Sequence, residues 1–198
     1  MGQVFRRAEQ YLDQLDKGYF VEIGTSRNGD DGSTKTLDSW ATSSGTHLHS
    51  VDIDVVNCEY VRNWNLPNTT VVNASGQEFL AYAASGISLL YLDNFDWDWH
   101  PDNTEDFVIE QQKHYKTFGL EMNNMNSQRA HLEQMILALP LMTEKSIVVC
   151  DDTWFNKWWG HYSGKSGAVV PFLLNNGYEV LHTQDDPEYG TILGRGIV

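Results

Sequence analysis

Acidic and glycine residues are closely spaced around one apolar segment near the start of the chain. The run at 19–23 contains Glu22 and passes into Gly24, and a loop of Gly, Ser, Asn and Asp residues leads to a helix start at Ser33. A second apolar segment ends in Asp52 and Asp54. Glycine lets a backbone approach a ligand closely, a helix N-terminus offers unpaired N–H groups, and an acid at a strand end accepts hydrogen bonds from ribose hydroxyls. The spacing therefore predicts a nucleotide-binding crevice.

The segments that must position these residues alternate between strand and helix patterns. The expected strands are 19–23, 47–53, 69–72, 87–92, 146–150, 178–183 and 190–197. The expected helices are 4–15, 33–42, 55–64, 77–84, 127–139 and 168–174. The run at 87–92 is the most apolar, as a central parallel strand buried on both faces should be. The last two strands are joined by the short link QDDPEY and must form an antiparallel hairpin, because a parallel crossover needs a dozen residues or more.

Two segments depart from this alternation. Residues 94–126 are irregular and polar, which predicts a functional lid. Residues 153–167, TWFNKWWGHYSGKSG, read as a Trp-rich loop. The aromatic side chains of both segments either pack the loops or form the wall of an acceptor pocket.

The charge balance is strongly acidic, with 27 Asp and Glu against 13 Lys and Arg and a net charge of −14 in 198 residues. Such a surface repels phosphate backbones, so we expect no nucleic-acid partner and favour a small neutral or cationic ligand. No apolar segment approaches the roughly 20 residues of a membrane-spanning helix, and the N-terminal segment lacks the apolar centre of a signal peptide. Cys58 and Cys150 lie apart in apolar surroundings, which indicates reduced thiols. We therefore expect a cytoplasmic protein without membrane contact.

The chain resembles the class I S-adenosylmethionine-dependent methyltransferases over nearly its whole length. Within them it looks most like the small-molecule O-methyltransferases, either the catechol type or the group that modifies antibiotics and sugars. The similarity rests on an acid-x-Gly turn into a helix, an acid ending the second strand, a polar turn near the adenine and an acid ending the fourth strand. In that order, the matching cofactor-binding positions are Glu22, Gly24, Thr25, Gly32, Ser33, Asp52, Ser75, Gln77 and Asp93.

The resemblance implies an α/β fold, a Rossmann-like three-layer sandwich. Its mostly parallel seven-stranded sheet would carry an antiparallel strand in a C-terminal hairpin, and the whole chain would form a single domain with an insert at 94–126. The chain departs from the family at the first turn. The position of the family's last Gly is occupied by Asn28, while Gly29 and Gly32 come later, so the loop carries an insertion at 28–31.

The resemblance also implies a metal site and a set of acid–base candidates. Metal-dependent members carry an Asp followed by Asp or Asn after the fifth strand, and IVVCDD provides Asp151 and Asp152 beside Asp93. Three carboxylates suit Mg²⁺, which would bind the acceptor hydroxyl, lower its pKa and orient it. The candidate catalytic residues are Asp93, Asp96, His100 and His131.

The implied activity is methyl transfer from S-adenosylmethionine to a small hydroxylated molecule, phenolic, sugar-like or antibiotic-like. Three other interpretations stay open: a non-catalytic S-adenosylmethionine-binding protein, a nicotinamide oxidoreductase on a related sheet, and a hydroxylase of the same family. The absence of GxGxxG and the terminal hairpin argue against the oxidoreductase. The oligomeric state is open as well, with a homo-oligomer as one option.

Overall fold

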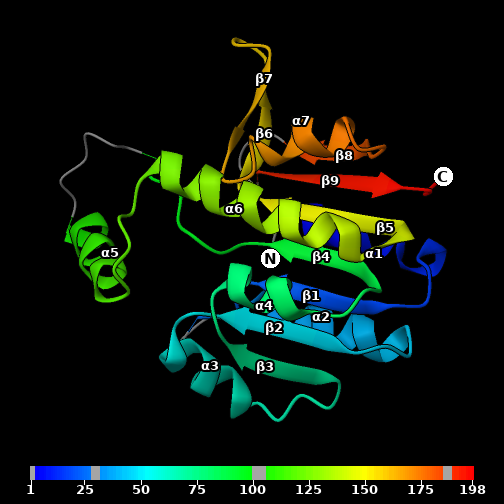
Figure 1. Cartoon of the computed structure of the whole chain (residues 1–198), viewed down its shortest axis with the longest axis horizontal. Coiled ribbons are helices and arrows are strands. Elements are labelled where there is room, and N and C mark those ends of the chain that lie inside the picture. The colour runs from blue at the N-terminus through cyan, green and yellow to red at the C-terminus, as the bar shows by residue number, and fades with distance from the viewer. Residues whose placement is uncertain (1–2, 28–31, 100–105, 185–188) are drawn as a thin grey trace.

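The architecture is a seven-stranded sheet covered by helices on both faces (Figure 1). The structure is a computed structural model that describes residues 3–27, 32–99, 106–184 and 189–198. The sheet has the strand order β3-β2-β1-β4-β5-β9-β8. These strands are β1 (Tyr19–Ile23), β2 (Leu48–Asp52), β3 (Thr69–Asn73), β4 (Ile87–Leu92), β5 (Met142–Asp151), β8 (Glu179–Gln184) and β9 (Gly190–Arg195).

Pairing within the sheet is parallel from β3 to β5 and antiparallel around β9. Strand β1 pairs in parallel with both β2 and β4, and β9 runs antiparallel to its two neighbours, β5 and β8. The Rossmann-like fold, the seven-stranded sheet and the antiparallel terminal hairpin are therefore confirmed. The sheet order reverses between β1 and β4, and in open α/β sheets ligands bind at that point, beyond the carboxyl ends of the strands.

Helices cover the two faces because successive strand side chains point to opposite sides. On one face, Phe20 of β1 packs with residues of α1 (Gln3–Glu9) and α2 (Ser33–Ser43). On the other, Val21 packs with residues of α4 (Gly76–Tyr82), α6 (Asn124–Ala138) and α7 (Val169–Leu174). The short helix α3 (Val55–Arg62) follows β2, and Asp54 caps it by accepting a hydrogen bond from Val56 N.

Two elements differ from the sequence-based expectation. The expected helix at 4–15 is shorter, because α1 gives way to a 3₁₀ turn at Leu12–Gln14. The expected Trp-rich loop is a hairpin, β6 (Thr153–Asn156) and β7 (His161–Gly164), which forms a separate two-stranded sheet. Its turn is held by Asn156 Oδ1, which accepts hydrogen bonds from Trp158 N and Trp159 N.

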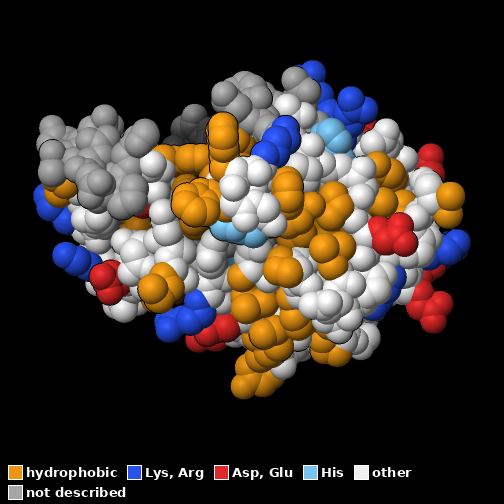
Figure 2. All heavy atoms as spheres, turned by 90° about the horizontal axis from the view of Figure 1, so that it is seen from above, with side chains coloured by type: hydrophobic (Ala, Val, Ile, Leu, Met, Phe, Trp, Pro, Cys, Tyr) orange, Lys and Arg blue, Asp and Glu red, His pale blue; other side chains and the backbone are white. Residues whose placement is uncertain are grey.

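The hairpin leaves large apolar side chains in solvent. Trp158 and Trp159 at its turn are 95% and 74% exposed. Figure 2 views the molecule from this side, and hydrophobic side chains gather across the middle of that face. Among the described residues, no helix combines the length and the apolar character needed to cross a membrane.

The described part of the expected lid includes the helix α5 (Asp106–Thr117), which stands apart from the sheet at the left of Figure 1. His114 Nε2 of α5 lies 2.9 Å from Asp54 Oδ2, at the end of β2. Tyr115 Oη accepts a hydrogen bond from Asp96 N at 2.6 Å. These two contacts attach α5 to the carboxyl end of the sheet.

Candidate functional site

A large cavity lies at the carboxyl ends of β1, β2, β4 and β5. Its volume is about 1270 Å³, larger than most ligand pockets of proteins. The loops after these strands form its floor, and α5 contributes Gln111, His114 and Tyr115 to its wall. The expected site residues that line it are Gly24, Thr25, Gly32, Ser33, Asp52, Ser75, Gln77, Asp93, Asp96, Asp151 and Asp152.

Two glycines allow the turn after β1 to form. Gly24 has φ +99°, a conformation that side chains rarely adopt, and a Cβ there would lie 2.6 Å from Asn94 N. A Cβ on Gly32 would lie 2.0 Å from Ser26 Oγ. Because Gly24 and Gly32 have no side chains, the turn can approach the end of β4 and the start of α2 closely. The rest of the expected insertion, at 28–31, lies outside the described residues.

Glu22 anchors this turn through hydrogen bonds of its carboxylate. Its side chain is fully buried and accepts hydrogen bonds from the hydroxyls of Ser33, Thr34 and Ser50, with Thr34 Oγ1 at 2.7 Å. Burial raises the pKa of Glu22 to about 7, although the three hydroxyls oppose the shift. Glu22 does not line the cavity. Its position therefore suits anchoring the turn, rather than the direct cofactor contact that the resemblance implies.

Asp52 lies at the tip of β2 with both carboxylate oxygens engaged by backbone. Its Oδ1 accepts a hydrogen bond from Asp54 N at 2.7 Å, and its Oδ2 accepts one from Thr25 N at 3.2 Å. These bonds link the ends of β1 and β2 and fix the carboxylate at the cavity wall. Burial raises the pKa of Asp52 to about 6, so the group is mostly ionised at pH 7.5. A carboxylate oxygen has more than one acceptor site, which leaves capacity for ligand hydroxyls.

The polar turn after β3 lies on the same cavity. Ser75 caps α4 in a capping box with Glu78, in which each side chain receives a hydrogen bond from the other's backbone N–H. Gln77 Oε1 accepts a hydrogen bond from Gln134 Nε2 of α6 at 3.3 Å. These contacts fix the turn relative to α6.

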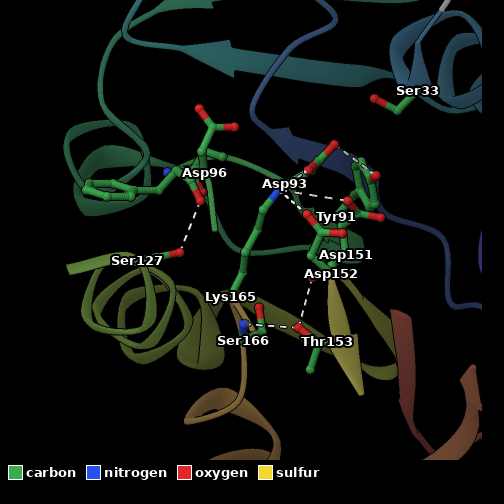
Figure 3. A network of polar contacts seen from close by, with 12 residues as sticks. Ser33, Tyr91, Asp93, Asp96, Ser127, Asp151, Asp152, Thr153, Lys165 and Ser166 are labelled. Atoms are coloured by element: carbon green, nitrogen blue, oxygen red, sulfur yellow. Dashed lines mark hydrogen bonds and ion pairs between the residues drawn. The ribbon is translucent and has the colours of Figure 1, made fainter. Parts of the chain in front are cut away.

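The three carboxylates after β4 and β5 converge as expected, but they converge on a lysine (Figure 3). Lys165 Nζ lies 2.8 Å from Asp93 Oδ1, 3.0 Å from Asp152 Oδ2 and 3.9 Å from Asp151 Oδ2. Tyr91 Oη donates a hydrogen bond to Asp93 Oδ2 at 3.1 Å. The Lys165 side chain is only 5% exposed.

The charges of this cluster depend on one another. Burial by itself lowers the pKa of Lys165, but the carboxylates outweigh it and raise that pKa well above its ordinary value, so the ammonium stays charged. Burial raises the pKa of Asp93, yet Lys165 more than offsets it and the net shift is downward. Burial and the charge of Asp93 raise the pKa of Asp151 well above its usual range. A proton on Asp151, hydrogen-bonded to Asp93, brings the cluster closer to neutrality.

These residues do not fit the expected Mg²⁺ site. An ammonium already lies among the three carboxylates, and a divalent cation between them would be placed against it. Over the described ranges, no group of three or more His, Cys, Asp or Glu side chains is arranged to hold a metal ion. The expected metal site is therefore wrong, because Lys165, which is distant in sequence from Asp93, occupies the centre of the cluster.

The other predicted catalytic residues differ in whether they line the cavity. Asp96 lines the cavity, where its Oδ1 lies 2.6 Å from Arg27 Nη2. His100 lies outside the described residues. His131 is fully buried away from the cavity lining, with Nε2 2.6 Å from Asn94 O and Nδ1 2.7 Å from Ser166 Oγ. Because Asn94 O can only accept, Nε2 carries the proton and Nδ1 accepts from Ser166. Burial lowers the pKa of His131 to about 4, so the ring stays neutral and links two loops.

Comparison with known proteins shows similarity to solved structures and none at the level of sequence. No protein-family model matches the chain, and no curated protein sequence is similar to it. Solved structures do match, among them a protein assigned as a methyltransferase from Streptococcus mutans in complex with S-adenosylhomocysteine. It is 11% identical with a TM-score of 0.59, and the match covers 98% of this chain and 99% of that one. The chain has the fold of the class I S-adenosylmethionine-dependent methyltransferases.

Two further structures show the range of proteins that share this methyltransferase fold. An rRNA methylase from Streptococcus thermophilus is 11% identical with a TM-score of 0.54, covering 98% of each chain. The 1,6-didemethyltoxoflavin-N1-methyltransferase of Burkholderia thailandensis, solved with bound 1,6-didemethyltoxoflavin and S-adenosylhomocysteine, is also 11% identical with a TM-score of 0.54. That match covers 98% of this chain and 78% of the other. At this level of identity the likeness concerns the fold and leaves the acceptor unassigned.

Proposed function

We propose that this protein is an S-adenosylmethionine-dependent methyltransferase that methylates an oxygen of a small hydroxylated molecule. The observation that carries the proposal is Asp52, a carboxylate fixed by two backbone N–H groups at the wall of the cavity beside Gly24. The shared fold supports the same conclusion, because structures with this fold contain S-adenosylhomocysteine. The cofactor-binding set that we propose consists of Gly24, Thr25, Gly32, Ser33, Asp52, Ser75 and Gln77.

In this assignment Asp52 accepts hydrogen bonds from the ribose hydroxyls. The backbone at Gly24 and Thr25 lies along the methionine part, and Ser75 and Gln77 lie near the adenine. Glu22 contributes indirectly by tying Ser33 and Thr34 to the turn. Because these groups are held by the sheet and by α2, little reorganisation accompanies binding.

The chemistry needs an acceptor oxygen held in line with the methyl carbon and the sulfur. The bound cofactor supplies the methyl group on a sulfonium, and transfer converts it to the neutral thioether. The acceptor proton passes to a carboxylate that faces the cavity, and Asp93, Asp96 and Asp152 are within the lining. Since the residues do not fit Mg²⁺, this scheme contains no metal-assisted step.

A small acceptor suits the charge of the molecule better than RNA, although an rRNA methylase shares the fold. The net charge of −14 opposes a polyanion, and a protein needs several cationic contacts to hold phosphates. Transfer of a labelled methyl group from S-adenosylmethionine, counted separately in small hydroxylated compounds and in RNA, distinguishes these acceptors.

The experiment that tests cofactor binding is a calorimetric titration of S-adenosylhomocysteine into wild type, Asp52→Asn and Asp13→Asn. Asp13 is exposed and does not line the cavity, so its variant is the matched control. Loss of a charged acceptor should weaken binding by about 1.5–3 kcal/mol, roughly 10- to 150-fold, in Asp52→Asn alone. Equal affinity in all three proteins would remove Asp52 from the cofactor site.

A further inference from the structure

The ammonium of Lys165 lies where the three site carboxylates meet, and it also lines the cavity. Lys165 Nζ donates a hydrogen bond to Asp93 Oδ1 at 2.8 Å and forms an ion pair with Asp152 Oδ2 at 3.0 Å. Asp151 Oδ2, at 3.9 Å, is beyond hydrogen-bonding distance. Among the described residues, these contacts leave at least one N–H donor of Lys165 for an oxygen atom in the cavity.

The backbone around Lys165 is fixed on both sides. Lys165 N donates a hydrogen bond to Asp152 O at 3.1 Å, and Ser166 N donates one to Thr153 Oγ1 at 3.0 Å. Before the lysine, Gly164 O accepts from Gln128 Nε2 of α6 at 3.1 Å. The β6–β7 hairpin thus returns the chain to the carboxyl end of β5 and directs one long side chain into the cluster.

Stability alone is a poor explanation for this arrangement. Removing two charges from water costs about as much as their attraction returns, and apolar replacements of buried ion pairs are often neutral or stabilising. An ion pair needed only for packing would also have no reason to line a ligand cavity. In the cavity lining, and held by anionic groups, Lys165 is instead placed where a cation could bind an oxygen atom of a ligand.

We propose that Lys165 is the resident cation of the acceptor site and occupies the place of a divalent metal ion among Asp93, Asp151 and Asp152. Asp93 and Asp152 hold the ammonium, and its remaining N–H binds the acceptor oxygen and orients it toward the methyl carbon. This inference rests on the proposed function, because the acceptor enters through that function. The occupancy of the carboxylate cluster is independent of it.

The test uses Mn²⁺ as the probe, titrated into the full chain and followed by the electron paramagnetic resonance signal of the free ion. Wild type should show no Mn²⁺ binding that depends on Asp152. Lys165→Ala removes the ammonium from the cluster, so the three carboxylates lose their neutralising partner and should close around one Mn²⁺, binding it at least tenfold more tightly than wild type does. The added change Asp152→Asn should abolish that gain, and Lys165→Arg, which keeps the positive charge, should behave like wild type.

Three results would overturn the inference: wild type that binds Mn²⁺ and loses it on Asp152→Asn, a folded Lys165→Ala that binds Mn²⁺ no better than wild type, or turnover abolished by EDTA. If circular dichroism shows that Lys165→Ala is unfolded, the comparison of wild type with Asp152→Asn still decides the question.

Once an acceptor is found, Lys165→Met should lower kcat at least tenfold and leave S-adenosylhomocysteine affinity within twofold. Mn²⁺ binding requires neither cofactor nor acceptor, so failure of S-adenosylhomocysteine to bind would refute the proposed function alone.

Discussion

At the scale of single residues, the site is governed by carboxyl groups whose burial differs. Glu22 is fully buried under three hydroxyls, whereas Asp52 is held at the cavity wall by backbone N–H groups. Both lie at the ends of adjacent strands, yet only Asp52 is placed to contact a ligand. Burial raises the pKa of both groups, to about 7 for Glu22 and about 6 for Asp52.

The raised pKa of Glu22 has a consequence for stability. Between its ordinary pKa of 4.5 and about 7, the folded state holds a proton that the unfolded state has lost. The free energy of unfolding therefore falls as pH rises through this window, and the Glu22 contribution amounts to about 3 kcal/mol at most. Glu22→Gln removes the ionisation, so urea unfolding at pH 5 and pH 7.5 should show a smaller loss of stability than wild type.

Glu59→Gln, a change at an exposed glutamate of α3, is the control and should follow wild type at both pH values. The same pH dependence in wild type and Glu22→Gln would mean that Glu22 is not protonated in the folded protein. Asp52 also makes the free energy of unfolding fall as pH rises. Because Asp52 is present in both wild type and Glu22→Gln, its contribution cancels when the two are compared.

The residue types and the family resemblance together were sufficient to predict Gly24, Thr25, Asp52 and Asp93 at one cavity, because these residues lie at or just after the ends of apolar strands. They were insufficient for Lys165, which reaches Asp93 across 72 positions of the chain. Its only local signal is the small-residue segment GKSG after the tryptophans. His131 was predicted at the site but is buried away from the cavity lining. A histidine on an amphipathic helix has the same local sequence pattern whether it faces a ligand or the core.

At the scale of elements, the β6–β7 hairpin is the feature that the sequence pattern did not predict. Its strands, TWFN and HYSG, are four residues each and do not alternate regularly between apolar and polar residues. Strand pairing there depends on the turn geometry at Asn156 and Gly160 and on contact with Asp152. The alternation of apolar and polar residues that identifies a strand in a sequence reveals none of these contacts. The hairpin matters because Lys165 follows β7 directly.

Gly164 at the end of β7 offers a test of that element. It has φ +91°, and a Cβ there would lie 1.8 Å from Asp152 O. Gly164→Ala should lower the free energy of unfolding by at least about 3 kcal/mol, measured by urea denaturation, because a left-handed backbone and a steric clash act together. Gly160→Ala is the matched control in the same hairpin, with φ +65° and no atom within 4 Å of the added Cβ, and should cost about 1 kcal/mol. Equal losses in the two variants would contradict the close approach of β7 to Asp152.

At the scale of the whole molecule, the order of the sheet decides where the chemistry can occur. The alternating strands and helices and the short terminal link allowed the fold to be predicted from sequence, because each follows from a local period or a loop length. The reversal of strand order between β1 and β4 then brings the turn at Gly24 beside Asp93. The residues that depend on irregular segments, at 94–126 and 153–167, could not be placed in this way.

The measurement that tests the central claim most directly is a crystal structure of the wild-type protein grown with S-adenosylhomocysteine and Mg²⁺. We expect the two ribose hydroxyls on Asp52, the homocysteine part along Gly24 and Thr25, and Lys165 still between Asp93 and Asp152. Ligand bound away from the ends of β1 and β2, or ribose oxygens that Asp52 does not contact, would contradict the account.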